Sequence, residues 1–192
     1  MTVNNSKVML GTPMQSTTGA IQVGAITAAA PTSATDTLTG FTGAGYVSED
    51  GVTVTPDYKT DSIKDWSAST VRDILSEFTG EISWTYIQTD YDSLCQVFGD
   101  EYVAKTEANA THGAQNKVSL GAHLPAEKSW CVQVKDGTAR VLVYVPKGQA
   151  IPNGDITLSA TDPLGWPIKV ACHPDSTGNS IYIFTDDGVV SA

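Results

Sequence analysis

The alternation of apolar and polar residues is the main structural signal in this sequence, and it is clear in residues 51–59. Four apolar side chains there share one parity and are separated by polar or charged ones: Val52, Val54, Pro56 and Tyr58. A period of two predicts a half-buried strand, because successive side chains point to opposite faces of a sheet. Residues 60–69 break this alternation, and their polar composition predicts a loop that carries one large aromatic side chain, Trp66.

The beginning of the next segment, residues 70–89, allows two interpretations. Four apolar residues have helical spacing, with Gly80 as a stop: Val71, Ile74, Leu75 and Phe78. The strand interpretation covers the whole segment, since five apolar residues share one parity: Ile74, Phe78, Ile82, Trp84 and Tyr86. We favour a strand because the alternation after Gly80 is unambiguous and continues in phase. Residues 51–59 and 70–89 are then the two strands of one long hairpin.

The opposite parity of the same predicted strand carries carboxylates at a spacing of four. They are Asp73, Glu77 and Glu81. A regular strand places residues of one parity on one face. The pattern by itself is equally compatible with an ordinary solvated sheet face and with a functional surface.

The remaining elements are mostly strands. Apolar positions in residues 91–98 have helical spacing between a possible N-cap, Asp90, and a possible stop, Gly99, so one α-helix is expected there. Asp136-Gly137 lies between two alternating runs and predicts a hairpin. Further strands are expected in residues 20–25, 118–122, 129–135, 138–145, 156–160, 168–173 and 180–185. Nine to ten strands and one helix predict a mainly β fold, a β-sandwich or barrel with a flanking helix.

Residues 1–42 differ from the rest in composition. They contain two charged residues, Lys7 and Asp36, and are rich in Thr, Ala, Ser and Gly. We expect an N-terminal arm with one short strand and a long loop over residues 27–40, followed by a single β-rich domain in residues 43–192. A loop of this length is either functional or a solvated segment, and the sequence supports both interpretations equally.

Charge and cysteine content narrow the class of protein. The 192 residues include 21 acids and 11 bases, a net charge of −10, which disfavours a nucleic-acid-binding protein. Neither a membrane-spanning segment nor a signal peptide is recognisable. Three widely spaced cysteines predict buried, reduced thiols in a cytosolic product: Cys95, Cys131 and Cys172.

The sequence contains no recognisable catalytic or metal-binding motif. The three histidines lie in separate segments without metal-ligand spacing, and no phosphate-binding glycine loop or nucleophile motif occurs. Asp186-Asp187-Gly188 is interpreted as a turn because further carboxylates at calcium-loop spacing are missing. We therefore expect no enzyme activity, no metal and no cofactor.

Several short motifs in the central region carry a family resemblance. They are Gly45-Tyr46-Val47-Ser48-Glu49-Asp50-Gly51-Val52, Lys64-Asp65-Trp66, Val71-Arg72, Phe78, Leu94 and Phe98-Gly99. This region, about residues 40–105, resembles the tail tube (major tail) proteins of tailed bacteriophages, in particular those of long, non-contractile tails. The likeness extends more weakly to residues 168–187, and the N-terminal arm shows no matching motif.

The resemblance implies a structural virion protein. In this family, six β-sandwich-like subunits form a ring, rings stack into a tube, and the genome is ejected through it into the host. It implies a tape measure protein and a tail terminator as partners, and double-stranded DNA that passes without specific binding. It also implies assembly in the host cytoplasm and location in the virion tail. No C-terminal Ig-like domain is expected, and a contractile sheath around the tube stays possible.

The resemblance also suggests roles for two groups of residues. The hairpin would join those of neighbouring subunits in one large barrel, with Asp73, Glu77 and Glu81 lining the lumen, where negative charge repels DNA phosphates. The loop between the strands would contact the next ring. Its candidate contact residues are Asp61, Ile63, Lys64, Asp65 and Trp66.

The sequence is also compatible with two other classes of protein. A β-sandwich with few charges is also typical of carbohydrate-binding and capsid-decoration modules, in which exposed Trp66 and Trp166 would stack on sugars. The alternative role for each tryptophan is core or interface packing. A hydrolase on a β scaffold is the least supported class, because no pair of acids is distinguished from the others.

Overall fold

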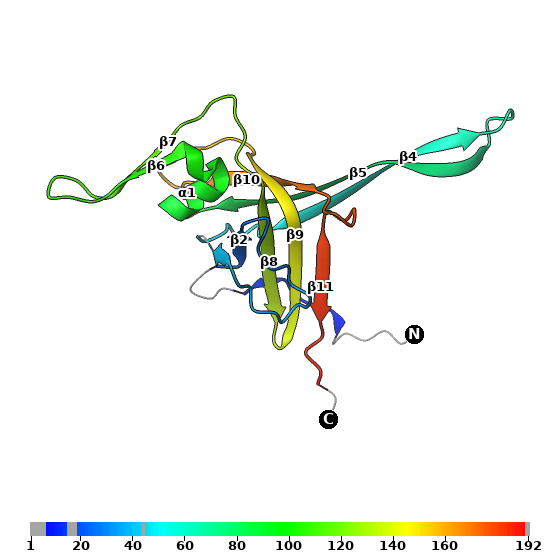
Figure 1. Ribbon diagram of the computed structural model, residues 1–192, viewed down its shortest axis with the longest axis horizontal. Coiled ribbons are helices and arrows are strands. Elements are labelled where there is room, and N and C mark those ends of the chain that lie inside the picture. The colour runs from blue at the N-terminus through cyan, green and yellow to red at the C-terminus, as the bar shows by residue number, and fades with distance from the viewer. Residues whose placement is uncertain (1–6, 15–18, 44, 191–192) are drawn as a thin grey trace.

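The computed structural model describes residues 7–14, 19–43 and 45–190, and within them the chain is mainly β with one α-helix (Figure 1). The helix α1 spans Tyr91–Phe98, and a short 3-10 helix spans Asp100–Tyr102. The strands are β1 Thr12–Pro13, β2 Ile21–Gly24, β3 Phe41–Gly43, β4 Thr53–Lys64, β5 Thr70–Tyr86, β6 Val103–Thr106, β7 Gln115–Val118, β8 Lys128–Asp136, β9 Ala139–Pro152, β10 Trp166–His173 and β11 Tyr182–Asp186. The predicted mainly β fold with a flanking helix is confirmed.

Nine strands form one antiparallel sheet in which β9 is the central connection. The order is β3-β2-β8-β9-β10-β5-β4, with β1 beside β8 and β11 beside β9. The first part of β9, Arg140 to Tyr144, pairs with β11, and its last part, Lys147 to Pro152, pairs with β10. β9 therefore joins a lower group of strands to an upper group that contains the β4–β5 hairpin (Figure 1).

The two faces of β8 and β9 support separate apolar clusters. Trp130 and Val132 belong to the larger cluster with α1 and the base of β5, whereas Cys131 between them belongs to the smaller one. Alternation along the strand explains this division. The smaller cluster is covered by the long segment between β2 and β3, in which Ala34 is buried and Leu38 packs on the cluster.

The helix and the tight hairpin form where local signals predicted them. The Asp90 carboxylate accepts a hydrogen bond from the Ser93 amide at 2.8 Å, and Gly99 ends the helix with φ 94°. Asp136 pairs with Ala139 across a turn in which Gly137 has φ 58°. The strand interpretation of residues 70–78 is also confirmed, because these residues belong to β5.

Other predicted boundaries are wrong. β4 continues to Lys64, so the expected polar loop of residues 60–69 shrinks to residues 65–69. Residues 156–160 form no strand, since the apolar side chains of Ile156 and Leu158 have no sheet to pack against and remain exposed. β7 ends at Val118, where a strand was expected to begin, and β3 and β6 were not predicted.

The N-terminal region contributes to the sheet. β2 pairs with both β3 and β8, and Ile21 is fully buried. The short strand expected near residues 20–25 is therefore confirmed. The division of the chain at residue 42 into an N-terminal arm and a β-rich domain stays a prediction.

A glycine at the middle of β9 makes close packing possible. A Cβ on Gly148 would lie against the side chains of Val170 and Trp130, and both of these residues are almost completely buried. We expect Gly148→Ala to lower the free energy of unfolding by about 1–3 kcal/mol through overpacking. Urea unfolding followed by circular dichroism measures this. Gly113→Ala is the control, because a Cβ there meets nothing within 4 Å; equal effects of the two changes would contradict the prediction.

The three cysteines are free and buried. Burial raises the pKa of the Cys131 and Cys172 thiols to about 12, and it also raises the pKa of Cys95. Few thiolates are then present at pH 8, so we expect no thiol to react with an alkylating reagent in the folded protein. Mass spectrometry should find three labels after denaturation without reductant. Fewer than three labels would reveal a disulfide and contradict the prediction.

Candidate assembly surface

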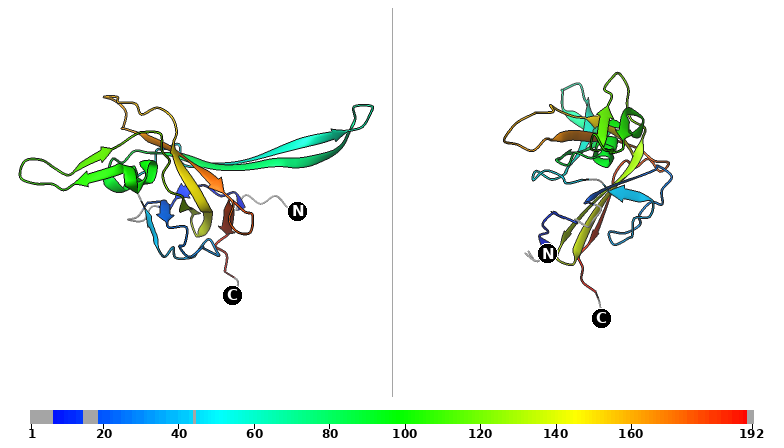
Figure 2. Two further views of the ribbon diagram at one scale, coloured as in Figure 1. Left: turned by 45° about the horizontal axis from the view of Figure 1, so that its top comes forward. Right: turned by 90° about the vertical axis from the view of Figure 1, so that its left-hand side faces the viewer.

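The β4–β5 hairpin extends far beyond the body of the molecule. β5 pairs with β10 from Tyr86 only as far as Gly80. Beyond that point β4 and β5 pair with each other alone, and we call this part, residues 57–79, the arm. Figures 1 and 2 show it projecting from one side of the body, opposite α1 and the β6–β7 hairpin. Within the described residues no third strand pairs with the arm, so both of its edges are open to a further strand.

A β-bulge divides the arm into two parts, and the alternation of β5 side chains between the two faces shifts by one residue from one part to the other. Lys59 lies opposite Glu77, and the next residue, Thr60, lies opposite Leu75, so Ser76 has no partner. An extra residue of this kind changes the alternation of β5 at that point. The Ser76 hydroxyl donates a hydrogen bond to the Lys59 carbonyl oxygen at 3.1 Å, which fixes the bulge.

The bulge separates the three acids that were expected on one face. Lys59 Nζ lies 2.6 Å from Glu77 Oε2, and the Ser62 hydroxyl donates to Asp73 Oδ1 at 2.5 Å. Because Lys59 and Ser62 differ by three positions on regularly alternating β4, they lie on opposite faces. The expectation of a common face is therefore wrong for Asp73, while Glu77 and Glu81 do share a face.

One face of the arm carries most of its charged side chains, and we call it the charged arm face; Ile63 and Ile74 lie on the same face. Five charged residues lie along it, Asp57, Lys59, Asp61, Arg72 and Glu77, and Glu81 continues this face at the base of the arm. Glu77 is paired with Lys59, and Glu81 lies 3.0 Å from Lys169 Nζ on β10. The glutamates are thus partly neutralised within the subunit, and a net charge of −2 remains on this face.

The opposite face continues the hydrophobic core outward, and sequence reasoning did not identify it as an exposed apolar surface. Val54 and Ile82 at the base pack in the core, and farther out the same face carries Pro56, Tyr58, Leu75 and Phe78, which we call the apolar arm face. The Tyr58 and Phe78 rings lie 4.7 Å apart, yet Tyr58 is 65% exposed. The alternation in residues 52–58 had indicated a half-buried strand; Val52 and Val54 do pack against the core, but no part of the described chain covers Pro56 and Tyr58.

The end of the arm is an ordered turn rather than a flexible loop. The Asp65 carboxylate accepts hydrogen bonds from the Ser67 hydroxyl at 2.7 Å and from the amides of Ser69 and Ser67, both at 2.9 Å. These bonds, that of the hydroxyl first, lower the pKa of Asp65. Asp65 N also donates to the Ser69 carbonyl oxygen at 2.9 Å. This network leaves the Trp66 side chain fully exposed.

The five residues predicted to contact another ring lie together at this end of the arm. Asp61, Ile63 and Lys64 belong to β4, and Asp65 and Trp66 belong to the turn. Ile63 is 50% exposed, so two apolar side chains are presented to solvent. Asp65 stabilises the turn itself. The inter-ring role of the group stays a prediction.

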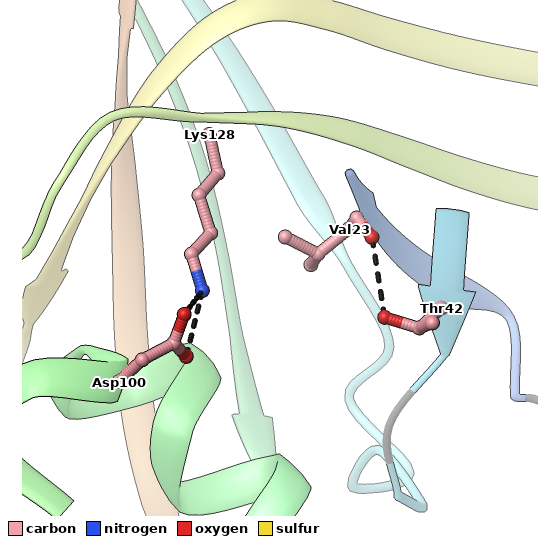
Figure 3. Close-up of polar contacts among 4 residues, drawn as sticks. All are labelled: Val23, Thr42, Asp100 and Lys128. Atoms are coloured by element: carbon pink, nitrogen blue, oxygen red, sulfur yellow. Dashed lines mark hydrogen bonds and ion pairs between the residues drawn. The ribbon is translucent and has the colours of Figure 1, made fainter. Parts of the chain in front are cut away.

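A recess of about 450 Å³ with a mixed polar and apolar lining lies between α1 and the β2–β3 pair. Figure 3 shows two of its contacts: Lys128 Nζ bonds both Asp100 carboxylate oxygens at 2.8 Å, and the Thr42 hydroxyl donates to the Val23 carbonyl oxygen at 3.4 Å. These bonds connect the end of the helix to β8 and β3 to β2. The recess is therefore explained by packing of the subunit.

Trp166, possible metal ligands and helix length bear on the alternative classes of protein. Trp166 is half-buried, packs against Phe98 and donates to the Thr89 hydroxyl at 3.0 Å, so the expectation of an exposed sugar platform at Trp166 is wrong. Within the described ranges, no group of three or more His, Cys, Asp or Glu side chains is arranged to hold a metal ion. No helix among the described residues has the length and apolarity needed to cross a membrane.

Comparison with models of protein families gives a match. The family model described as phage tail tube protein matches residues 1–190, nearly the whole chain. A search of curated proteins finds no match. The family match includes the N-terminal region, where no resemblance was recognised from motifs.

Proposed function

Because the chain belongs to the phage tail tube protein family, we propose that six copies close into a ring and that rings stack head to tail around the channel used for genome ejection. The broader role follows from the family: the chain is a structural protein of the virion tail and assembles from many subunits into a tube. A head-to-tail interface of this kind builds an open-ended filament. The tape measure protein and the tail terminator are its proposed partners, and the host cytoplasm is the proposed place of assembly.

The observation that carries the ring proposal is the arm with two open edges and two unlike faces. A two-stranded ribbon is only marginally stable on its own in water. If the β4 edge of one arm pairs with the β5 edge of the next, six arms form a closed barrel without free edges. The apolar arm face would then turn outward against neighbouring bodies, and the charged arm face would line the lumen.

Negative-stain microscopy of the purified protein tests this proposal. We expect tubes or rings with a central hole, and class averages viewed along the axis should show six-fold symmetry. A different symmetry would contradict only the proposed number of six subunits per ring. Monodisperse monomers at all concentrations, together with glycan binding, would favour the carbohydrate-binding alternative.

The charge of the lumen is expected to affect genome passage. Glu77→Lys combined with Glu81→Lys changes the charged arm face by +4 per subunit, since each substitution replaces −1 by +1. We expect normal tails that eject DNA slowly, because lysines attract phosphates. Ejection should recover at high salt, where this attraction is screened.

The matched control for the charge change is the pair Asp155→Lys and Glu107→Lys, which alters exposed acids on other loops. Time-resolved DNA release from purified particles is the measurement. Slow ejection by both variants would attribute the effect to net charge in general. Normal ejection by the Glu77/Glu81 variant would show that these residues do not line the lumen.

A further inference from the structure

An apolar groove of about 490 Å³ lies beside the base of the arm, where β4 begins next to β8 and β9. Its lining is dominated by valines, and we call it the valine groove: Val47, Val52, Val54, Val132, Val134 and Val143. Its volume is in the range of sites that enclose aromatic-sized groups. The groove continues the main core cluster but is not filled by the described part of the chain.

One wall of the groove is built from the segment that carries the family resemblance. Residues 45–52 contribute Gly45, Val47, Ser48, Glu49, Gly51 and Val52 to the lining. Gly51, with φ 70°, closes a turn in which its amide donates to the Ser48 carbonyl oxygen at 3.0 Å. This turn places Glu49 in the lining, and Glu49 forms no ion pair with any described residue.

The end of the arm has properties complementary to those of the valine groove. Trp66 and Ile63 are exposed apolar groups of a size that the groove accepts. Lys64 and Arg72 beside them form no ion pair within the described ranges. Asp65 and Asp73 are already hydrogen-bonded within the arm. Among the charges at this end of the arm that no ion pair or hydrogen bond between described residues engages, the two bases outnumber the one acid, Asp61, which leaves a net charge of +1 to meet an acidic group elsewhere.

The arm cannot place its end in the groove of its own subunit. Eight residues of β4, from Asp57 to Lys64, extend beyond the last β10 pairing, which at about 3.3 Å per residue carries the turn roughly 25 Å from the body. The paired strands hold it there (Figure 1). Only another molecule can receive it.

We propose that the valine groove of one subunit receives the arm end of a second copy of this chain in the next ring. Trp66 and Ile63 enter the groove, and Lys64 and Arg72 face Glu49 in its lining. Large aromatic side chains that fill a pocket often dominate an interface, and the charged contact sets the register. This inference rests on the proposed assembly into stacked rings and assigns its receptor site.

A charge exchange tests the contact. Glu49→Lys alone and Lys64→Glu alone each place like charges together, and we expect each to raise the protein concentration needed for tube formation by about tenfold. The double variant restores opposite charges and should return within about threefold of the wild type. Glu101→Lys, an exposed acid elsewhere, is the control. A double variant that assembles worse than either single variant would overturn the pairing.

Disulfide trapping identifies the contact directly. Subunits with Ser67→Cys at the turn are mixed with subunits carrying Ser48→Cys in the groove, assembled and oxidised; the native cysteines are buried. A crosslinked dimer on a non-reducing gel is expected, and Ser176→Cys in place of Ser48→Cys should give none. Well-formed tubes without the dimer, or with equal crosslinking to Ser176→Cys, would overturn the docking alone. Failure of the wild type to form tubes would overturn the proposed function as well.

Discussion

Replacing Trp66 with alanine is expected to leave a folded subunit that no longer forms long tubes. The side chain is fully exposed and lies on an ordered turn, so its removal costs the monomer almost nothing. In the proposed stack it is buried in the next ring, and that burial contributes on the order of 3 kcal/mol per contact. Six contacts act together in each ring, so a moderate loss at each one suppresses polymerisation strongly.

Circular dichroism and negative-stain microscopy check the Trp66 prediction together. The spectrum should match the wild type, while micrographs show monomers or single rings. Leu158→Ala is the matched control, because Leu158 is also highly exposed but lies far from the arm in the chain. If Trp66→Ala forms full-length tubes, Trp66 does not take part in the stacking contact. If the variant unfolds, Trp66 belongs to the core of the subunit. Replacing residues 61–66 by a Gly/Ser linker is a less selective test, since it also removes the end of β4.

Replacing Phe78 with lysine is expected to prevent ring formation. Phe78 lies on the apolar arm face beside Tyr58, and in the proposed ring this face packs against a neighbouring subunit. A lysine there buries a charge without a partner, which is a large penalty in an apolar interface. The monomer keeps its fold because the arm extends outside the body (Figure 2).

Thr79→Lys is the control for this experiment, because it introduces the same charge one residue away on the charged arm face, opposite Asp57. Mass photometry and microscopy should detect rings for Thr79→Lys and none for Phe78→Lys. The reverse result would mean that the faces of the arm are assigned the wrong way round. Rings from both variants would show that the arm does not take part in closure.

Elements formed by interactions close in the chain were predictable. The helix followed from its apolar spacing, the Asp90 cap and Gly99, all within ten residues. The β8–β9 hairpin followed from Asp136-Gly137 between two alternating runs. Each depends on backbone preferences that a short stretch of sequence expresses by itself. The family resemblance of the central motifs likewise needed no three-dimensional information, and the family match confirms it.

Elements that depend on a distant strand were not predictable. Residues 60–64 have no periodic pattern, and they form a strand only because β5 supplies their hydrogen-bonding partners. Residues 156–160 have a periodic pattern but no neighbouring strand, and they remain irregular. Backbone groups of a strand are satisfied only by another strand, so the pairing decides the outcome.

The candidate site shows the same division between what the sequence and the fold decide. The hairpin, its acids and its exposed tryptophan were all identified from residue types, which the sequence states directly. The faces of the arm were not, because the unpaired Ser76 shifts the phase of β5 and separates Asp73 from Glu77. One extra residue in a ladder moves every following side chain to the other face. Its position depends on the register between two strands, and the tertiary structure alone determines that register.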